Sequence, residues 1–227
     1  MSQGPRRSPL PLPEVAPLPV PADFEERLAK LGVTLDGAAK TKLASFLALL
    51  LAMNEQVNLT AITEPEAAWS RHALDALSLV PELADLPRGA HVLDVGSGGG
   101  VPGIPLAIAR PDLHVTLLDA TEKKVAFIGA AAAKLELENV TAVSGRAEQA
   151  NLGRVFDVVV ARAVAKISTL LGWTAPFAKE GGRLLFIKGE RADAELGEAK
   201  EALRRFRCDH ERTVLTPTGR IVVLRVG

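Results

Sequence analysis

Four glycines in five positions, residues 96–100, place the strongest constraint on how this chain can fold. They follow an apolar segment, residues 92–95, which predicts a buried strand and in which Asp94 is the one acid. Pro102 comes next, at a position that suits the first turn of a helix. The order strand, glycine loop, helix lets a ligand lie close to bare backbone, opposite the N–H groups of a helix start.

Strands and helices are predicted to alternate after this loop. Apolar runs predict strands over 113–118, 139–143, 155–161 and 183–188, and helical spacing predicts helices over 121–137, 167–178 and 191–206. Residues 212–216 and 220–226 predict a terminal β-hairpin. The pattern indicates an α/β, Rossmann-like fold with a mainly parallel, twisted sheet, in which ligands bind at the carboxyl ends of the strands.

The chain before the loop has a different character. Seven of the first 21 residues are proline, which predicts a disordered arm over 1–21. Residues 22–88 are expected to form an N-terminal helical extension, with helices over 22–31, 38–56 and 64–80, and residues 89–227 to form the α/β domain.

Composition limits the partners and the compartment. The 27 basic and 27 acidic residues give a formal net charge of zero, so a nucleic-acid partner requires a local basic face. Cys208 is the only cysteine, which excludes an internal disulfide and a cysteine-based zinc site, and suits the cytoplasm. We expect no metal site, no signal peptide and no membrane partner, because the longest apolar stretch, 43–53, is about half the roughly 20 residues that a membrane helix needs.

Two cofactor classes compete for the glycine loop. The dinucleotide fingerprint G-x-G-x-x-G is present at Gly98, Gly100 and Gly103, but it is out of register. Its first glycine should directly follow the strand, and counting from that glycine, Gly96, places Val101 at the third position. An NAD-dependent oxidoreductase therefore stays an alternative with a poor fit.

The second pattern is acid-x-Gly-x-Gly-x-Gly, which Asp94, Gly96, Gly98 and Gly100 satisfy. It resembles the first motif of S-adenosylmethionine-dependent methyltransferases. That cofactor has no pyrophosphate, but it carries a sulfonium, an ammonium and a carboxylate, so an acid beside the loop is useful. The glycines let its amino-acid part pass close to the backbone.

Four further residues lie where strands end. Asp119 ends the second strand, where an acid can accept hydrogen bonds from both ribose hydroxyls or cap the next helix. Ala147 and Glu148 follow the third strand, where an adenine-binding loop is expected, although Glu148 also fits a solvated turn. Arg162 ends the fourth strand, at the mouth of the same site, and suits a positioning role or a structural one.

Catalytic motifs that the sequence lacks indicate which kind of atom accepts the methyl group. Residues 161–164 are Ala-Arg-Ala-Val, not the Asn/Asp-Pro-Pro-aromatic motif of exocyclic-amine methyltransferases. Cys208 is too late in the chain to be the nucleophile of a pyrimidine-C5 enzyme. A ring nitrogen such as guanine N7 already exposes a lone pair, so it needs alignment but no general base. A small-molecule methyltransferase and a non-catalytic binding module stay open at this point.

Several stretches in order carry a family resemblance: Asn54-Glu-Gln-Val-Asn-Leu-Thr60, Arg71-His-x-x-Asp75, the loop from Asp94 to Leu106, Leu117-Leu-Asp119-x-x-x-Lys-Lys-x-x-Phe127, Arg146-Ala-Glu148, Asp157-Val-Val-Val-Ala-Arg-Ala163 and Lys188-Gly189. Together they resemble the bacterial glucose-inhibited division protein B family of 16S rRNA guanine-N7 methyltransferases, over about residues 23–226. That family often has an aromatic residue directly before Asn54, where this chain has Met53.

The resemblance implies an enzyme, its cofactor and its partner. It implies S-adenosylmethionine contacts at Gly96, Val101, Asp119, Ala147, Glu148 and Arg162. It also implies a guanine in the 530-loop region of 16S rRNA as the target, in free rRNA or in a small-subunit assembly intermediate. We expect the protein to act as a monomer.

A basic rim is expected around the cofactor mouth, because several cations lie at strand ends. Its candidate members, which would contact RNA phosphates, are Arg71, His72, Lys123, Lys124, Arg162, Lys166, Lys188 and Arg191. Aromatic residues make up only 4% of the chain, so recognition of folded rRNA shape is favoured over stacking on an aromatic platform.

Overall fold

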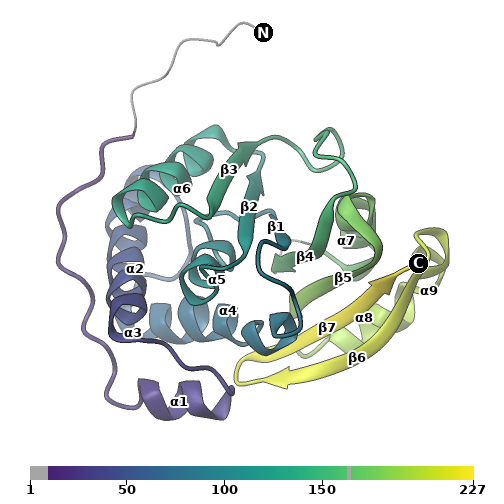
Figure 1. The fold of residues 1–227 in the computed structure, drawn as a ribbon, viewed down its shortest axis with the longest axis horizontal. Helices are drawn as coiled ribbons and strands as arrows, with labels where there is room; N and C mark the ends of the chain where they lie inside the picture. Colours follow the sequence, from purple (N-terminus) through teal and green to yellow (C-terminus); the bar gives the residue numbers. More distant parts are fainter. Residues whose placement is uncertain (1–9, 163–164) are drawn as a thin grey trace, which may run out of the picture.

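The computed structural model describes residues 10–162 and 165–227 and contains one seven-stranded sheet of order β3-β2-β1-β4-β5-β7-β6 (Figure 1). Its strands are β1 (His91–Val95), β2 (His114–Asp119), β3 (Val140–Ser144), β4 (Phe156–Arg162), β5 (Ala178–Lys188), β6 (Cys208–Thr216) and β7 (Gly219–Val226). The first five strands pair in parallel, whereas β7 is antiparallel to both of its neighbours. The predicted parallel sheet with a terminal hairpin is confirmed.

Helices cover both faces of this sheet. Those of the α/β part are α5 (Gly103–Ala109), α6 (Glu122–Lys134), α7 (Ile167–Thr174), α8 (Ala192–Glu198) and α9 (Lys200–Arg205). The single helix predicted over 191–206 is two helices, because Ala199 turns out of helical geometry between them. The helix predicted to reach residue 178 becomes a 3-10 turn, η3 (Ala175–Phe177), at Pro176. The helix predicted to reach residue 137 ends at Lys134, and Glu136 has a positive φ of 52°.

The N-terminal helices share their hydrophobic core with the α/β part. They are α1 (Phe24–Lys30), α2 (Gly37–Val57), α3 (Pro65–Ala68), the π-helical turn η1 (Trp69–Leu74), α4 (Asp75–Leu77) and the 3-10 turn η2 (Val80–Leu83). Asp36 caps α2 by accepting the backbone N–H of Ala39 at 2.7 Å. Phe46 and Leu50 of α2 are fully buried in one cluster with Ile104 of α5. The expected extension over 22–88 therefore completes the core on one face of the sheet.

Residues 10–21 lie along the outside of the N-terminal helices, which differs from the solvated arm predicted for 1–21. Leu10, Leu12, Val15 and Leu18 pack against the core cluster that contains α2 and α6. The Leu18 N–H also donates to the carbonyl of Ala44 at 3.2 Å. Alternate apolar residues between the prolines give this segment a side that can be buried. The first nine residues of the predicted arm lie outside the described part of the chain.

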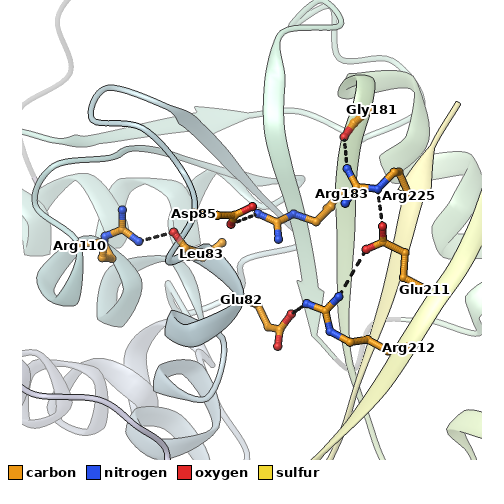
Figure 2. A network of polar contacts seen from close by, with 9 residues as sticks. All are labelled: Glu82, Leu83, Asp85, Arg110, Gly181, Arg183, Glu211, Arg212 and Arg225. Carbon is orange, nitrogen blue, oxygen red and sulfur yellow. Dashed lines mark hydrogen bonds and ion pairs between the residues drawn. The ribbon is translucent and has the colours of Figure 1, made fainter.

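Charged pairs join the end of the N-terminal part to the C-terminal strands (Figure 2). Glu82 of η2 contacts Arg212 of β6, and Asp85 accepts from Arg183 of β5 at 2.6 Å. These contacts span about half of the chain length in sequence and hold η2 against the antiparallel side of the sheet. Within the described residues, no helix has both the length and the apolar character of a membrane span.

Candidate functional site

The glycine loop turns sharply at the carboxyl end of β1. Gly96, Gly98 and Gly100 have φ values of 72°, 56° and 89°, in the left-handed region that side chains disfavour. The N–H groups of Gly96 and Ser97 both donate to the carbonyl of Leu118, at 2.8 and 3.1 Å. The loop is thereby fastened to the end of β2, and it leaves the end of β1 open to a ligand.

Asp94 is buried at the end of β1, where the glycine loop begins. Its side chain is fully buried, and Oδ2 accepts the N–H of Gly103 at 2.9 Å, which fixes the start of α5. Burial, together with nearby Asp119, raises the pKa of Asp94 to about 7, although the Gly103 bond and Arg162 act in the opposite direction. Its Oδ1 is buried with no partner, so it offers one unused acceptor.

A cavity of about 240 Å³ opens at the ends of β1, β2 and β3. Its lining residues are Val95, Gly96, Leu118, Asp119, Ala120, Gly145, Arg146, Ala147, Glu148 and Trp173. The predicted cofactor residues Gly96, Asp119, Ala147 and Glu148 are therefore brought together. Apolar walls with one acid at the end of the second strand suit the base and ribose of a nucleoside.

Asp119 is held in place by two backbone groups. Its Oδ2 accepts from the N–H of Gly98 at 2.8 Å, and its Oδ1 accepts from the N–H of Thr121 at 2.9 Å. An ionised carboxylate has about four acceptor sites, so both oxygens keep capacity for ribose hydroxyls. The alternative role as a helix cap is not seen, because Thr121 lies before the first residue of α6.

Five of the nine predicted cofactor residues do not line this cavity: Asp94, Gly98, Gly100, Val101 and Arg162. Gly98 and Gly100 shape the loop, and the side chain of Val101 is 4% exposed within the core. Trp173 of α7 was missed because a tryptophan in an apolar helix resembles any core residue. The turn residues Ala120, Gly145 and Arg146 directly precede predicted positions or follow them, so widening each predicted strand-end loop would have included them.

Arg162 is the centre of a polar chain that reaches back to α2. Its Nη1 donates to the carbonyl of Arg71 at 2.7 Å, and its Nη2 lies 3.3 Å from Nδ1 of His72. The other ring nitrogen of His72 lies 2.9 Å from the hydroxyl of Thr60. The N–H of Thr60 in turn donates to Oδ1 of Asn54 at 2.8 Å. The chain joins segments that the sequence separates by up to about a hundred residues.

His72 is a structural member of this chain rather than an RNA contact. It is 2% exposed, and burial and nearby Arg162 lower its pKa to about 4, so the ring is neutral near pH 7. Because an arginine can only donate, Nδ1 accepts and Nε2 carries the proton given to Thr60. The expectation that His72 contacts phosphate is therefore wrong.

A second cavity, of about 320 Å³, has Arg162 in its lining. Its lining residues are Arg71, Asp75, Arg162, Ile187, Lys188, Gly189, Glu190, Arg191, Glu195 and Thr218. It therefore opens at the ends of β4 and β5, beside the turn of the β6–β7 hairpin. Since parallel strands end at one edge, both cavities open along the same edge of the sheet.

Four of the eight candidates of the expected basic rim lie within ion-pair distance of neighbouring acids: Arg71, Lys166, Lys188 and Arg191. Lys188 has only 8% of its side chain exposed, pairs with Glu195 at 2.8 Å and donates to the carbonyl of Ala165, so it is structural. Lys166 and Arg191 both approach the carboxylate of Glu198, at 3.3 and 3.8 Å. The rim therefore offers less positive charge to RNA phosphates than the number of its lysines and arginines indicates.

Four of the rim candidates, Arg191 among them, divide into two groups according to whether they line a cavity. Arg71 and Arg191 have more than half of their side chains exposed and line the second cavity, where they can meet phosphates. Lys123 and Lys124 lie in the first turn of α6 and line neither of these two cavities. Contact of the α6 lysines with RNA stays a prediction.

Comparison with known proteins shows which family the chain belongs to. The family model described as GidB, rRNA small subunit methyltransferase G, matches residues 39–219. This chain belongs to the GidB family. GidB proteins named ribosomal RNA small subunit methyltransferase G include one from Sorangium cellulosum, which is 54% identical over 222 residues, 96% of this chain and 93% of the relative. Another, from Chromohalobacter salexigens, is 44% identical over 177 residues, 78% of this chain and 83% of the relative.

Solved structures show the same fold at low identity. A SAM-dependent methyltransferase from Aquifex aeolicus has a TM-score of 0.55 at 20% identity, with coverage of 71% of this chain and 93% of that chain. The antibiotic-resistance methyltransferase Kmr has a TM-score of 0.52 at 17% identity, with coverage of 67% and 93%. The GidB chain thus has the Rossmann-like methyltransferase fold predicted from its sequence.

Membership in GidB resolves the choice of cofactor. The protein is an S-adenosylmethionine-dependent rRNA methyltransferase, and the NAD-dependent alternative, already out of register, is not supported. The residues of the first cavity fit this cofactor: Asp119 would accept from the ribose hydroxyls, apolar side chains would contact the adenine, and the bare backbone at Gly96 would leave room for the amino-acid part.

Proposed function

We propose that this protein methylates N7 of a guanine in the 530-loop region of 16S rRNA. The observation that carries the proposal is the pair of neighbouring cavities at one sheet edge, with Arg162 reaching from the end of β4 into the second of them. The first cavity suits a nucleoside cofactor, and the second is open to a separate polar acceptor. Such an arrangement holds a methyl donor and an acceptor base beside each other.

Methyl transfer to N7 requires the protein to align the base with the methyl donor, but not to remove a proton. When bound, S-adenosylmethionine supplies a methyl group on a positively charged sulfur. N7 would accept this methyl group with its own lone pair, the electrons of the broken C–S bond would stay on the sulfur, and no proton would have to be removed. This fits the state of His72, whose two ring nitrogens are both engaged, so that the histidine is not a free base.

Arg162 positions the acceptor in this proposal. It uses two of its donors on Arg71 and His72, which leaves the others for the substrate. No described carboxylate lies within ion-pair distance of Arg162, so its guanidinium keeps its attraction for an oxygen of the base or the RNA. Arg71 and Arg191 at the cavity mouth are placed for the phosphates.

The setting follows from the substrate. We propose that the protein works in the cytoplasm, on free 16S rRNA or on a small-subunit assembly intermediate. We also propose that the active unit is a monomer. Light scattering on the protein with and without rRNA would measure that state.

The decisive experiment is methyl transfer to 16S rRNA from cells that lack this protein. Purified protein and labelled S-adenosylmethionine are incubated with the free rRNA or with the small subunit, and mass spectrometry maps the product. We expect one modified guanine in the 530-loop region, methylated at N7. Methylation of another atom, or transfer only to small metabolites, would contradict the proposal.

A matched pair of variants tests the cofactor cavity. Gly96→Arg places a long side chain in the cavity, so we expect loss of S-adenosylhomocysteine binding by calorimetry. Gly129→Arg is the control, because Gly129 lies on α6 with open space around its Cβ position. Equal binding by both variants would show that the cofactor lies elsewhere.

A further inference from the structure

The second cavity contains a buried acid that the reaction described above does not use. Asp75, the first residue of α4, is 5% exposed and lines the cavity together with Arg162. Burial raises its pKa to about 6, although Arg71 and Arg162 oppose the shift, so the carboxyl is ionised near pH 7. A buried carboxylate that faces a cavity is costly unless donors satisfy it.

Within residues 10–162 and 165–227, the protein satisfies only part of this carboxylate. Its Oδ1 accepts from the hydroxyl of Thr218, in the turn between β6 and β7. Its Oδ2 lies 3.8 Å from Nε of Arg71, which is longer than a hydrogen bond. Thr218 therefore orients the group, and Oδ2 keeps acceptor capacity for a ligand in the cavity.

The other carboxylates of the cavity are less suited to hold a ligand. Glu195 already accepts from Lys188 at 2.8 Å and from the N–H of Ile167 at 3.1 Å. Glu190 is exposed to solvent at the rim. Asp75 is thus the acid in this cavity that is both buried and incompletely bonded.

The order of groups along the sheet edge matches one edge of guanine. Arg162 interacts electrostatically with Asp94, at the end of β1 beside the cofactor loop, and with Asp75. β4, which ends in Arg162, lies between β1, whose end carries the loop, and β5, whose end lines the second cavity together with Asp75, so Arg162 is placed between the loop and Asp75 along the sheet edge. Guanine presents, in order around its rim, the N7 acceptor, the O6 acceptor, and the N1–H and N2–H donors. A base with N7 toward the cofactor loop would therefore bring O6 to Arg162 and its donors to Asp75.

We propose that Asp75 determines guanine specificity by accepting the N1–H and N2–H groups of the target base, while Arg162 donates to O6. This assignment rests on the proposed function and adds to it a reason for the choice of base. Adenine carries an amino group at position 6 and an acceptor at N1, so it would face Arg162 with a donor and Asp75 with an acceptor.

The test compares guanine with inosine, which keeps N7, O6 and N1–H but lacks the 2-amino group. Small subunits are assembled on 16S rRNA that carries either base at the mapped target position. The ratio of kcat/KM for guanine to that for inosine is then measured for the wild-type protein and for Asp75→Asn. We expect the wild-type ratio to be about 10–100, since a site built to bond an amino group rejects the analogue without it. We expect the Asn variant to have a ratio near 1.

Two further variants keep the test decisive. Asp85→Asn is the matched control, because Asp85 pairs with Arg183 away from both cavities, and it should retain the wild-type ratio. Thr218→Val keeps Asp75 but removes the hydroxyl that orients it, so the ratio should fall part of the way toward 1 even if Asp75→Asn does not fold. Binding of S-adenosylhomocysteine reports the integrity of each variant.

Each outcome decides the assignment. A wild-type ratio near 1 overturns it. So does an equal loss on guanine and inosine in Asp75→Asn or Thr218→Val, because that result would make Asp75 only a structural residue. If the wild-type protein binds S-adenosylhomocysteine but modifies neither RNA at N7, the proposed function itself fails and the assignment fails with it.

Discussion

At the scale of single residues, Asp94 makes the folded protein sensitive to pH. Its pKa is about 7 in the folded state against an ordinary 3.8, so the folded state binds more protons between these values. Stability should therefore fall as the pH rises through this window and level off above the folded pKa. Asp75, with a raised pKa of about 6, acts in the same direction.

Replacing Asp94 measures its contribution to the pH dependence of stability. We expect the stability of Asp94→Asn relative to the wild type to improve by up to about 3 kcal/mol between pH 5 and pH 8, because the variant has no charge to bury. Urea unfolding at several pH values measures the difference, and the contribution of Asp75 cancels because both proteins retain it. A difference that does not change with pH would show that Asp94 is ionised without cost in the folded state.

Gly99 shows how tightly the loop is packed. A Cβ at this position would lie 2.6 Å from Cδ1 of Leu50 and 3.1 Å from Cβ of Leu59, both of them buried. We expect Gly99→Ala to lose about 1–3 kcal/mol of stability through overpacking. Gly129→Ala, in the open part of α6, should be neutral or gain up to about 1 kcal/mol in the same urea titration. Equal stability of the two variants would contradict this account.

At the scale of elements, the proline-rich segment is expected to stabilise the domain. Leu18 packs against the core, whereas Val20 is 44% exposed. Leu18→Ser should therefore cost about 1 kcal/mol or more of unfolding free energy, and Val20→Ser should stay within about 0.5 kcal/mol. Methyl transfer should be unaffected in both, since neither residue is near the cavities. A neutral Leu18→Ser would mean that the segment is attached only weakly.

The elements that were predicted well are those with a strong local pattern. Val158, Val159 and Val160 form an apolar run that is fully buried on both faces of the sheet, and the strand was found from that run alone. The breaks inside helices were missed. The division at Ala199 and the π-helical turn at Trp69 depend on what each segment packs against, which composition does not encode.

The candidate site also contains features that the sequence predicts and features that depend on tertiary packing. That Gly96 and Asp119 lie at one cavity could be predicted, because the topology brings the ends of parallel strands to one edge of the sheet and does not depend on side-chain packing. The roles of His72 and Lys188 were not predictable, since a basic residue beside a site resembles a phosphate contact until its partners are known. Thr60 and Thr218 meet the site only through tertiary packing, from opposite ends of the chain.

At the scale of the whole molecule, the N-terminal part and the C-terminal hairpin stabilise each other. Glu82 has 10% of its side chain exposed and pairs with Arg212 (Figure 2). A double-mutant cycle with Glu82→Gln and Arg212→Met should give a coupling of about 1–3 kcal/mol in urea unfolding. The control cycle is the Glu26–Lys30 pair, with both side chains about 70% exposed, for which we expect less than about 0.5 kcal/mol. Similar values for both cycles would mean that η2 contributes little to holding the hairpin.

The two cavities draw on separate parts of the chain, and this has a consequence for how such enzymes diverge. The cavity beside the glycine loop is lined by residues between 95 and 173, whereas the second cavity is lined by the turn around Arg71, the ends of β4 and β5, and the hairpin turn at Thr218. Arg162, at the end of β4, belongs to the second set. If the second cavity holds the target base, as proposed above, substitutions in the second set should leave the binding of the methyl donor unchanged, and exchanging short surface segments on an inherited scaffold should be enough to change the target nucleotide.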